Sequence, residues 1–212
     1  MTVYTVTSTD DMMSEPLQHL VVGSYTSRGL ALDECAAYML ERVGRNPDIA
    51  WMASRDENHP DASRFFEEDE DGCTVVAHGK GEELRAYLRD ALAGEGCYYV
   101  YDGADGTWHV DIDENDVEGG MWFVVTCGES NVRRDDGFTR PWPEAYASEE
   151  AALCAVVAYL RDLLESYGEE IPDDFETEVR KALLDGKAYH LDLGDDVAMN
   201  AVLYHSDARN IK

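Results

Sequence analysis

A helical pattern occurs twice in this chain, and the two copies are 121 residues apart. Residues 25–43 and 146–164 each start with Tyr-x-Ser and continue into apolar residues at helical spacing. Six residues are identical: Tyr25, Ser27, Ala31, Leu32, Ala37 and Tyr38 match Tyr146, Ser148, Ala152, Leu153, Ala158 and Tyr159. Ser27 and Ser148 lie where a helix-capping hydroxyl belongs. The chain must therefore bury two similar helix faces.

Matching segments follow each copy in the same order. Residues 83–90 and 178–185 predict a second helix, and residues 97–100 and 188–191 each predict a strand. A further strand is expected at 107–112 and at 198–204, and each half opens with one, at 3–7 and at 121–126. We predict an α+β fold of two related β-α-α-β-β units, each with an antiparallel sheet and helices on one face. Chance identity between helices rich in alanine and leucine is the alternative explanation.

The two units differ in their insertions. The first unit, residues 1–116, carries extra material at about 45–80, with a strand expected at 73–78. The second unit, residues 117–212, carries a long loop at about 128–143. Acidic residues and two glycines at 114–120 are typical of a connector between units. If the units pack side by side, their sheets could be continuous.

Acidic residues dominate the composition: 45 Asp and Glu stand against 17 Lys and Arg, a formal net charge of −28. Such a surface repels the phosphates of nucleic acids and anionic membranes, so neither is an expected direct partner. No apolar run reaches the roughly 18 residues of a membrane-spanning helix, and we find no export signal. Five cysteines without a close pair predict reduced thiols in the cytoplasm. Cys35 and Cys154 are expected to be buried on apolar helix faces.

Clusters of acidic residues supply most of the candidate partner-binding positions. These are Glu67, Glu68, Asp69, Glu70 and Asp71; Asp111, Asp113, Glu114 and Asp116; and Glu169, Glu170, Asp173 and Asp174. Like charges repel and resist burial, so the clusters are expected to face solvent. They form either a hydrated coat or an array that replaces phosphates for the arginines of a partner, because carboxylates accept bidentate hydrogen bonds from guanidinium.

One segment runs against the acidic trend. Arg133, Arg134 and Arg140 lie close to Trp142, which is flanked by two prolines. Arginine and tryptophan are enriched at binding hot spots, so Trp142 is a further candidate partner-binding residue. The alternative is that Trp142 caps the core while the arginines pair with neighbouring acids.

No spacing of residues indicates an enzyme or a cofactor site. The six histidines lack the His-Glu-x-x-His spacing of a metal site, and the glycines form no phosphate-binding loop. Residues 111–122 do not fit a calcium loop, because Asp116 and Trp122 occupy the positions that need Gly and Glu. We therefore expect a non-enzymatic protein with no metal and no cofactor, although a catalytic carboxylate pair would not stand out among 45 acids.

In charge and size the chain resembles the small acidic proteins by which phages and plasmids block restriction or CRISPR enzymes. The resemblance implies an inhibitor that mimics DNA and docks into the basic nucleic-acid-binding groove of a host-defence protein. Since duplex DNA carries one charge per about 1.7 Å, a charge of −28 corresponds to about 48 Å of duplex, comparable with the diameter of this chain. Such mimicry requires the acids to gather on one face. The alternative is a salt-adapted cytoplasmic protein with a structural or accessory role, whose acidity serves solubility.

Overall fold

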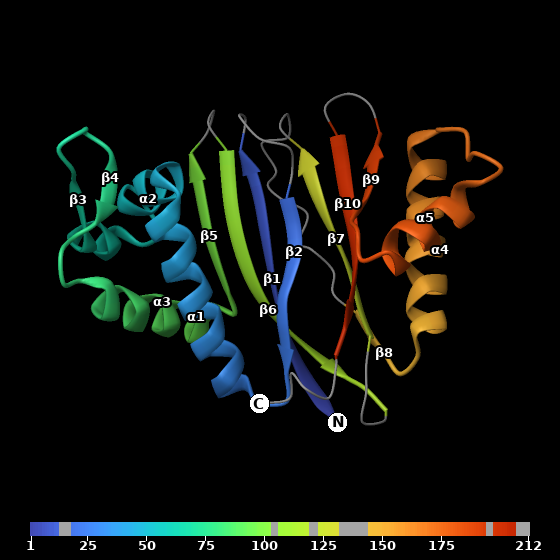
Figure 1. Ribbon diagram of the computed structural model, residues 1–212, viewed down its shortest axis with the longest axis horizontal. Helices are drawn as coiled ribbons and strands as arrows, with labels where there is room; N and C mark the ends of the chain where they lie inside the picture. The colour runs from blue at the N-terminus through green and yellow to red at the C-terminus, as the bar shows by residue number, and fades with distance from the viewer. Residues whose placement is uncertain (13–17, 103–105, 119–122, 132–143, 194–196, 207–212) are drawn as a thin grey trace.

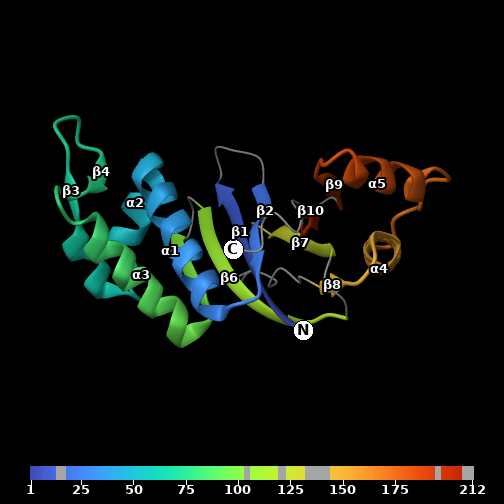
Figure 2. The ribbon, with the colours of Figure 1, turned by 60° about the horizontal axis from the view of Figure 1, so that its bottom comes forward.

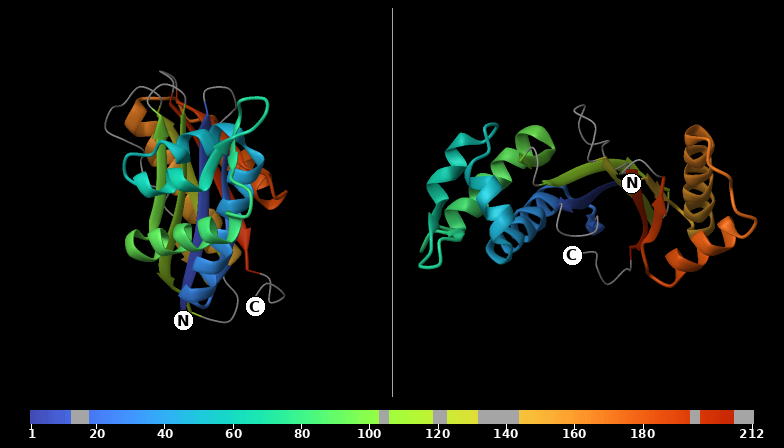
Figure 3. Two further views of the ribbon diagram at one scale, coloured as in Figure 1. Left: turned by 90° about the vertical axis from the view of Figure 1, so that its left-hand side faces the viewer. Right: turned by 90° about the horizontal axis from the view of Figure 1, so that it is seen from above.

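The computed structural model describes residues 1–12, 18–102, 106–118, 123–131, 144–193 and 197–206. Two four-stranded antiparallel sheets lie in the centre of an elongated molecule, with helices at both ends of its long axis (Figure 1). Two further directions of view confirm that the helices of the two halves flank the pair of sheets (Figure 2, Figure 3). Within the described ranges, no helix combines the length and the apolar composition needed to cross a lipid bilayer.

The first half of the chain forms one large sheet, one small sheet and four of the described helices. Its elements are β1 (Thr2–Met12), β2 (Gln18–Tyr25), α1 (Arg28–Arg45), α2 (Pro47–Ser54), the 3-10 helix η1 (Pro60–Phe65), β3 (Phe66–Glu68), β4 (Thr74–Val76), α3 (Gly81–Glu95), β5 (Cys97–Asp102) and β6 (Gly106–Asp116). The large sheet, which we call sheet A, has the strand order β2-β1-β6-β5. Strands β3 and β4 pair with each other in a separate hairpin.

The second half forms the other large sheet, sheet C, and two described helices. Its elements are β7 (Phe123–Asn131), β8 (Glu144–Tyr146), α4 (Glu149–Tyr167), α5 (Phe175–Leu184), β9 (Tyr189–Asp192) and β10 (Val197–His205). The strand order is β8-β7-β10-β9. Taken along the chain, β7, β8, β9 and β10 therefore occupy the places that β1, β2, β5 and β6 occupy in sheet A.

The α+β fold with antiparallel sheets is confirmed, and four details of the prediction need correction. Each half contains an unexpected strand, β2 or β8, directly before its first helix. The two large sheets are separate and not continuous. The insertion at 45–80 holds two short helices and the β3–β4 hairpin, whose second strand is the one expected at 73–78. Of the loop expected at 128–143, residues 128–131 belong to β7 and 132–143 lie outside the described residues.

Helices α1 and α4 bury the same face. The buried residues of α1 are Ala31, Leu32, Cys35, Ala36, Met39 and Val43, and those of α4 are Ala152, Leu153, Val156, Val157, Leu160 and Leu164. Every member of the second set follows its counterpart by 121 residues. The predicted caps are present as well: the Oγ of Ser27 accepts a hydrogen bond from the backbone N–H of Leu30, and that of Ser148 from Ala151.

The strand registers also correspond. In sheet A, Tyr4 pairs with Tyr25 and Tyr98 pairs with Val110. In sheet C, Phe123 pairs with Tyr146, which follow Tyr4 and Tyr25 by 119 and 121 residues, and Tyr189 pairs with Ala201, which both follow their counterparts by 91 residues. A one-residue slip would exchange the two faces of a strand, so the matching registers show that both sheets turn equivalent positions toward their helices.

Three hydrophobic clusters hold the molecule together. The largest lies between sheet A and helices α1, α2 and α3, and includes Trp108, Tyr98 and Met39. The second lies between sheet C and helices α4 and α5, around Leu160 and Phe175. The third is small and joins the sheets; it consists of Val3, Val117 and Val124, with Val21, Ala145 and Tyr204 packed against them. Each sheet therefore has a core of its own, with the helices on one face.

Candidate functional site

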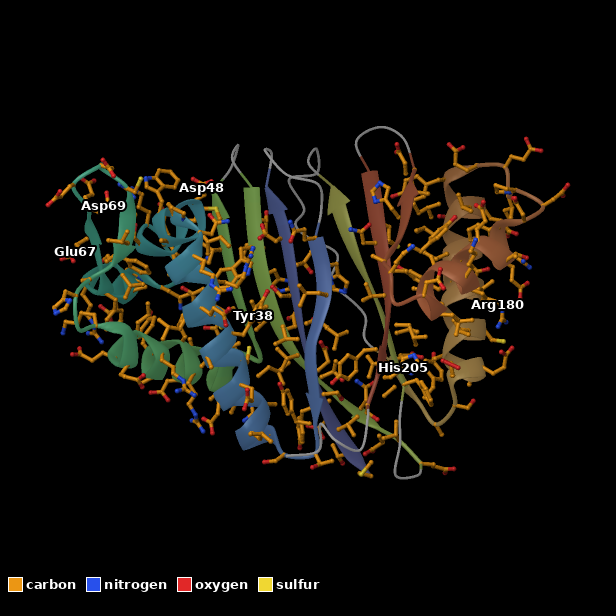
Figure 4. All side chains as sticks on the ribbon, viewed as in Figure 1. Tyr38, Asp48, Glu67, Asp69, Arg180 and His205 are labelled. Carbon is orange, nitrogen blue, oxygen red and sulfur yellow. The ribbon has the colours of Figure 1, made fainter. Side chains whose placement is uncertain are left out.

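The acidic run Glu67–Asp71 forms the tip of the β3–β4 hairpin, at one end of the long axis (Figure 4). All five side chains are exposed. Two of them also shape the hairpin: the Oδ1 of Asp69 accepts hydrogen bonds from the backbone N–H groups of Asp71 and Cys73, and the Oε1 of Glu67 accepts one from His78. The tip therefore faces solvent as predicted, and Asp69 has a local structural role.

A shallow surface hollow of about 290 Å³ lies at the base of this hairpin. It is lined by Ser54, Arg55, Ser63, Phe66, Glu67, Glu68 and Thr74. Because Arg55 stands beside Glu67 and Glu68, the lining holds both signs of charge. The hollow is therefore not a uniformly acidic receptor for a cationic side chain.

Glu169, Glu170, Asp173 and Asp174 lie in the connection between α4 and α5, at the opposite end of the molecule (Figure 1). All four are exposed, as are Glu165 and Glu178 beside them. In the described part of the chain, none of these six residues is within ion-pair distance of a lysine or an arginine. We call these six residues the acidic corner. The hairpin tip and the acidic corner are thus two separate acidic surfaces.

Two carboxylates of the acidic corner affect the pKa of a neighbouring tyrosine, Tyr189. Burial, and then the nearby carboxylates of Glu178 and Asp174, raise the pKa of the Tyr189 hydroxyl. Basic residues are held slightly apart from this corner: Arg180 forms ion pairs with Glu150 and Glu176 at 3.0 and 2.9 Å (Figure 4). The acidic corner itself is therefore left with uncompensated negative charge.

The third predicted cluster lies on β6, where side chains alternate between two faces. Glu114 and Asp116, near the end of the strand, are exposed, and Asp113 is half-buried. Asp111 is only 2% exposed, so the expectation that it faces solvent is wrong. The physical reason is strand alternation: Asp111 points to the face of sheet A opposite the helices, and that face is itself covered.

This second face of sheet A is polar and buried. It carries Thr5, Thr7 and Thr9 from β1, all fully buried, and His109 and Asp111 from β6. Across the strands, Thr9 is the partner of His109 and Thr7 is the partner of Asp111. The opposite face of the same strands carries Val6, Trp108 and Val110 of the main core. Alternation of polar and apolar residues along β1 and β6 was visible in the sequence, but it is usually a sign of a solvated face.

Cys97, His109 and Asp111 meet on this face, at the junction of β5 and β6. Cys97 is the cross-strand partner of Asp111, and His109 lies two residues before Asp111 on β6. The Nδ1 of His109 is 3.1 Å from the Oδ2 of Asp111. One ligand atom from each of the three residues lies within 4.8 Å of the other two. Burial alone lowers the pKa of His109, but hydrogen bonds to Asp111 and Cys97 outweigh it and raise this pKa to about 9.

A second histidine of the same face, His19, has a lowered pKa, whereas the pKa of His109 is raised. His19, on β2, is 5% exposed, and its Nδ1 is 2.8 Å from the Oγ1 of Thr9. Burial, reinforced by the charge of His109, lowers the pKa of His19 to about 3. The face therefore holds a charged imidazole paired with a carboxylate beside a neutral imidazole bonded to a hydroxyl.

The other residues singled out in the sequence are Cys35, Cys154 and Trp142 with the arginines near it. Cys35 is buried as expected, and burial together with the charge of Asp111 raises the pKa of its thiol to about 12. The same expectation is wrong for Cys154, which is exposed because it lies beside the buried stripe of α4 and contacts Arg180. Trp142 and the arginines near it lie outside the described residues.

Comparisons with protein-family models, with curated proteins and with solved structures find no match for this chain. Within the described ranges, the chain has two exposed acidic surfaces and one buried cluster of ligand-type side chains.

Proposed function

We propose that this protein is a non-enzymatic, acidic interaction protein that binds a basic nucleic-acid-binding protein of the restriction or CRISPR type. The single observation that supports this proposal is the acidic corner between α4 and α5, with six exposed carboxylates and no ion pair among the described residues. A partner whose groove binds phosphates would find carboxylates that accept the same bidentate hydrogen bonds from arginine.

The six carboxylates of the acidic corner lower the stability of the folded protein because they lie close together. Neighbouring carboxylates repel one another and destabilise the compact state. Part of the arrangement has a local explanation, because Asp174, Glu176 and Glu178 lie at the start of α5, where acids stabilise the helix dipole. Glu165, Glu169 and Glu170 lie at the carboxyl end of α4 or just beyond it, where the dipole disfavours acids. A cationic partner would offset that repulsion.

A second candidate function is supported by the separation of the two acidic surfaces. The hairpin tip and the acidic corner lie at opposite ends of the long axis (Figure 1), and α3 and α4 carry further exposed acids. Charge at both ends is what a salt-adapted protein with a structural or accessory role needs for hydration. The two acidic surfaces do not form the single acidic face that mimicry along the whole molecule requires, so under the inhibitor proposal one partner groove engages one end of the molecule.

We also propose that residues 1–116 and 117–212 are two units related by internal duplication. The constant offset of the buried helix residues and the matching strand registers support it. Two independent origins would have to reproduce the caps, the buried faces and the strand order together. Under this proposal, the insertion that carries the hairpin tip was acquired by the first unit alone.

Three variants that each remove three exposed charges test the inhibitor proposal. The first is Glu169→Gln, Glu170→Gln and Asp173→Asn at the acidic corner. The second is Glu68→Gln, Glu70→Gln and Asp71→Asn at the hairpin tip, which leaves Asp69 in its turn. The matched control is Glu82→Gln, Asp90→Asn and Glu95→Gln on α3, whose side chains are exposed.

The assay is inhibition of DNA cleavage by purified restriction and CRISPR nucleases at increasing KCl concentration. We expect the wild-type protein to inhibit, salt to weaken inhibition, and the acidic-corner variant to lose inhibition while the α3 control keeps it. Equal losses in all three variants would indicate a response to net charge only. Absence of inhibition, together with thermal stability that continues to rise in molar KCl, would favour the salt-adapted protein.

A further inference from the structure

We propose that Cys97, His109 and Asp111 form a binding site for a divalent transition-metal ion of the zinc type. The three residues supply a thiolate, an imidazole and a carboxylate, which are the three side-chain ligands that zinc takes in proteins. None of them belongs to the hairpin tip or to the acidic corner, on which the proposed function depends. The site is therefore independent of partner binding.

The geometry of the cluster suits such an ion. In a tetrahedral zinc site with bonds of about 2.0 to 2.3 Å, the ligand atoms are about 3.3 to 3.8 Å apart. In the described structure the three ligand atoms lie within 4.8 Å of one another, and the histidine and aspartate atoms are 3.1 Å apart. Small side-chain rotations would therefore bring all three to bonding distance. Three protein ligands leave a fourth tetrahedral position for a water molecule or another donor.

The backbone holds the ligands in place before any ion binds. Helix α3 ends at Gly96, which has a φ of +76°, and β5 begins at the next residue, Cys97. The backbone N–H of Ile112 donates to the carbonyl of Gly96 at 2.9 Å, which fixes the start of β5 beside β6. Ligands that come from two paired strands are more rigid than ligands on loops, and rigidity lowers the cost of binding.

Charge compensation also favours a dication. Asp111 is 2% exposed and His109 is 5% exposed, while Cys97 is half-buried. The imidazole of His109 must release its proton to bind an ion, and a divalent ion then neutralises the thiolate of Cys97 and the carboxylate of Asp111 within the interior. Half-burial of Cys97 leaves that side of the cluster open enough for an ion to enter.

The fold does not require these three residues. At the offset of 91 that relates β5 and β6 to β9 and β10, the corresponding residues are Ala188, Asn200 and Val202. Sheet C is formed in the same strand order without a thiol, an imidazole or a carboxylate at these places. The ligand set is thus a specific property of the first half, where it adds a chemical capacity beyond packing. Its sequence spacing is unlike a zinc motif because β-strand pairing brings the ligands together.

Cobalt(II) is the probe for this site, because a bound thiolate gives it a charge-transfer absorption that surface carboxylates cannot produce. The protein is first stripped with EDTA and then titrated with Co²⁺ in excess Mg²⁺, which occupies weak carboxylate sites. We expect a thiolate band that saturates at one ion per chain and disappears when Zn²⁺ is added. The expected dissociation constant increases at least about tenfold in Cys97→Ser.

The second half of the chain supplies the control for folding. A triple variant, Cys97→Ala, His109→Asn and Asp111→Val, installs the residues of sheet C, and we expect it to fold but to show no thiolate band. Cys73→Ser, at the exposed hairpin tip, should keep the band. Zn²⁺ should raise the melting temperature of the wild type and of Cys73→Ser only. A wild type that binds Co²⁺ without a thiolate band, or a band that persists in Cys97→Ser, would overturn the proposal.

Discussion

Sheet A and sheet C have the same strand order and the same registers, yet their second faces differ in chemistry. On sheet A that face carries His109, Asp111 and Asp113 along β6, with threonines beside them on β1. The residues at the same places on β10 are Asn200, Val202 and Tyr204. The faces that pack on the helices, in contrast, are apolar in both sheets. Packing on helices therefore accounts for the shared pattern, and the second face is where the two halves differ.

The ion pair between Asp10 and Arg42 is a further difference between the halves, on the helix side of the sheet. Arg42 of α1 donates to the carboxylate of Asp10 on β1, whose side chain is 7% exposed. At the offsets that relate the two halves, the corresponding residues are Glu129 and Leu163, so this pairing of charges belongs to the first half alone. The first half therefore combines a partly buried ion pair with a buried polar face.

The largest expected loss of stability follows from truncating one buried side chain in either of the two equivalent cores. Met39 in α1 and Leu160 in α4 are both fully buried and are related by the offset of 121. Met39→Ala and Leu160→Ala should each lower the free energy of unfolding by about 2 to 5 kcal/mol, because each leaves a cavity in its core. Urea unfolding followed by circular dichroism measures both losses.

A matched control for these variants is Leu184→Ala, because Leu184 is an exposed residue, 53% accessible, at the end of α5. That change should cost less than about 0.5 kcal/mol. If Met39→Ala or Leu160→Ala behaved like Leu184→Ala, the two helix faces would not be equivalent in packing. The comparison between the halves would then be limited to backbone geometry.

The polar face of sheet A predicts a smaller, pH-dependent effect at His19. Its pKa is about 3 in the folded protein, against an ordinary value of 6.5. The unfolded chain therefore takes up the proton first, so the contribution of neutral His19 is present above pH 6.5 and is lost as the pH falls. Between pH 7 and pH 5 the loss should be about 2 kcal/mol relative to His19→Asn.

This pH effect is measured as the difference in unfolding free energy between wild type and His19→Asn, with EDTA present so that no metal contributes. Titration of the many carboxylates affects both proteins equally and cancels in the difference. A parallel pH dependence in the two proteins would mean that His19 is protonated in the folded state. The polar face would then be more open to water than its burial indicates.

The sequence predicted helices α1, α3, α4 and α5 and most strands because each depends on local patterns, whereas α2 and η1 in the insertion were not predicted. The stripes of α1 and α4 and the caps Ser27 and Ser148 are local, and all are confirmed. The strands β2 and β8 were missed because each lies directly before a helix and carries no strong apolar alternation. The burial of Asp111 and its approach to Cys97 depend on strand pairing between residues 14 apart and on a second layer over the sheet. Neither can be read from residue spacing.

The smallest expected effect compares the two helix caps. The hydroxyl of Ser27 accepts from the N–H of Leu30 at 3.4 Å, and that of Ser148 accepts from Ala151 at 3.2 Å. Ser27→Ala and Ser148→Ala should each cost about 1 kcal/mol, because each leaves one N–H group of the first turn without its capping acceptor. Ser166→Ala is the control, since Ser166 donates to the carbonyl of Leu163 within α4 and caps nothing. Thermal unfolding of the three variants at one pH measures the losses.

Because Glu149 and Glu150 already stabilise the start of α4 and α1 has no acid in its first turn, any inequality should make Ser27→Ala the more costly change. A larger loss in Ser148→Ala would contradict the proposed contribution of Glu149 and Glu150 to the start of α4.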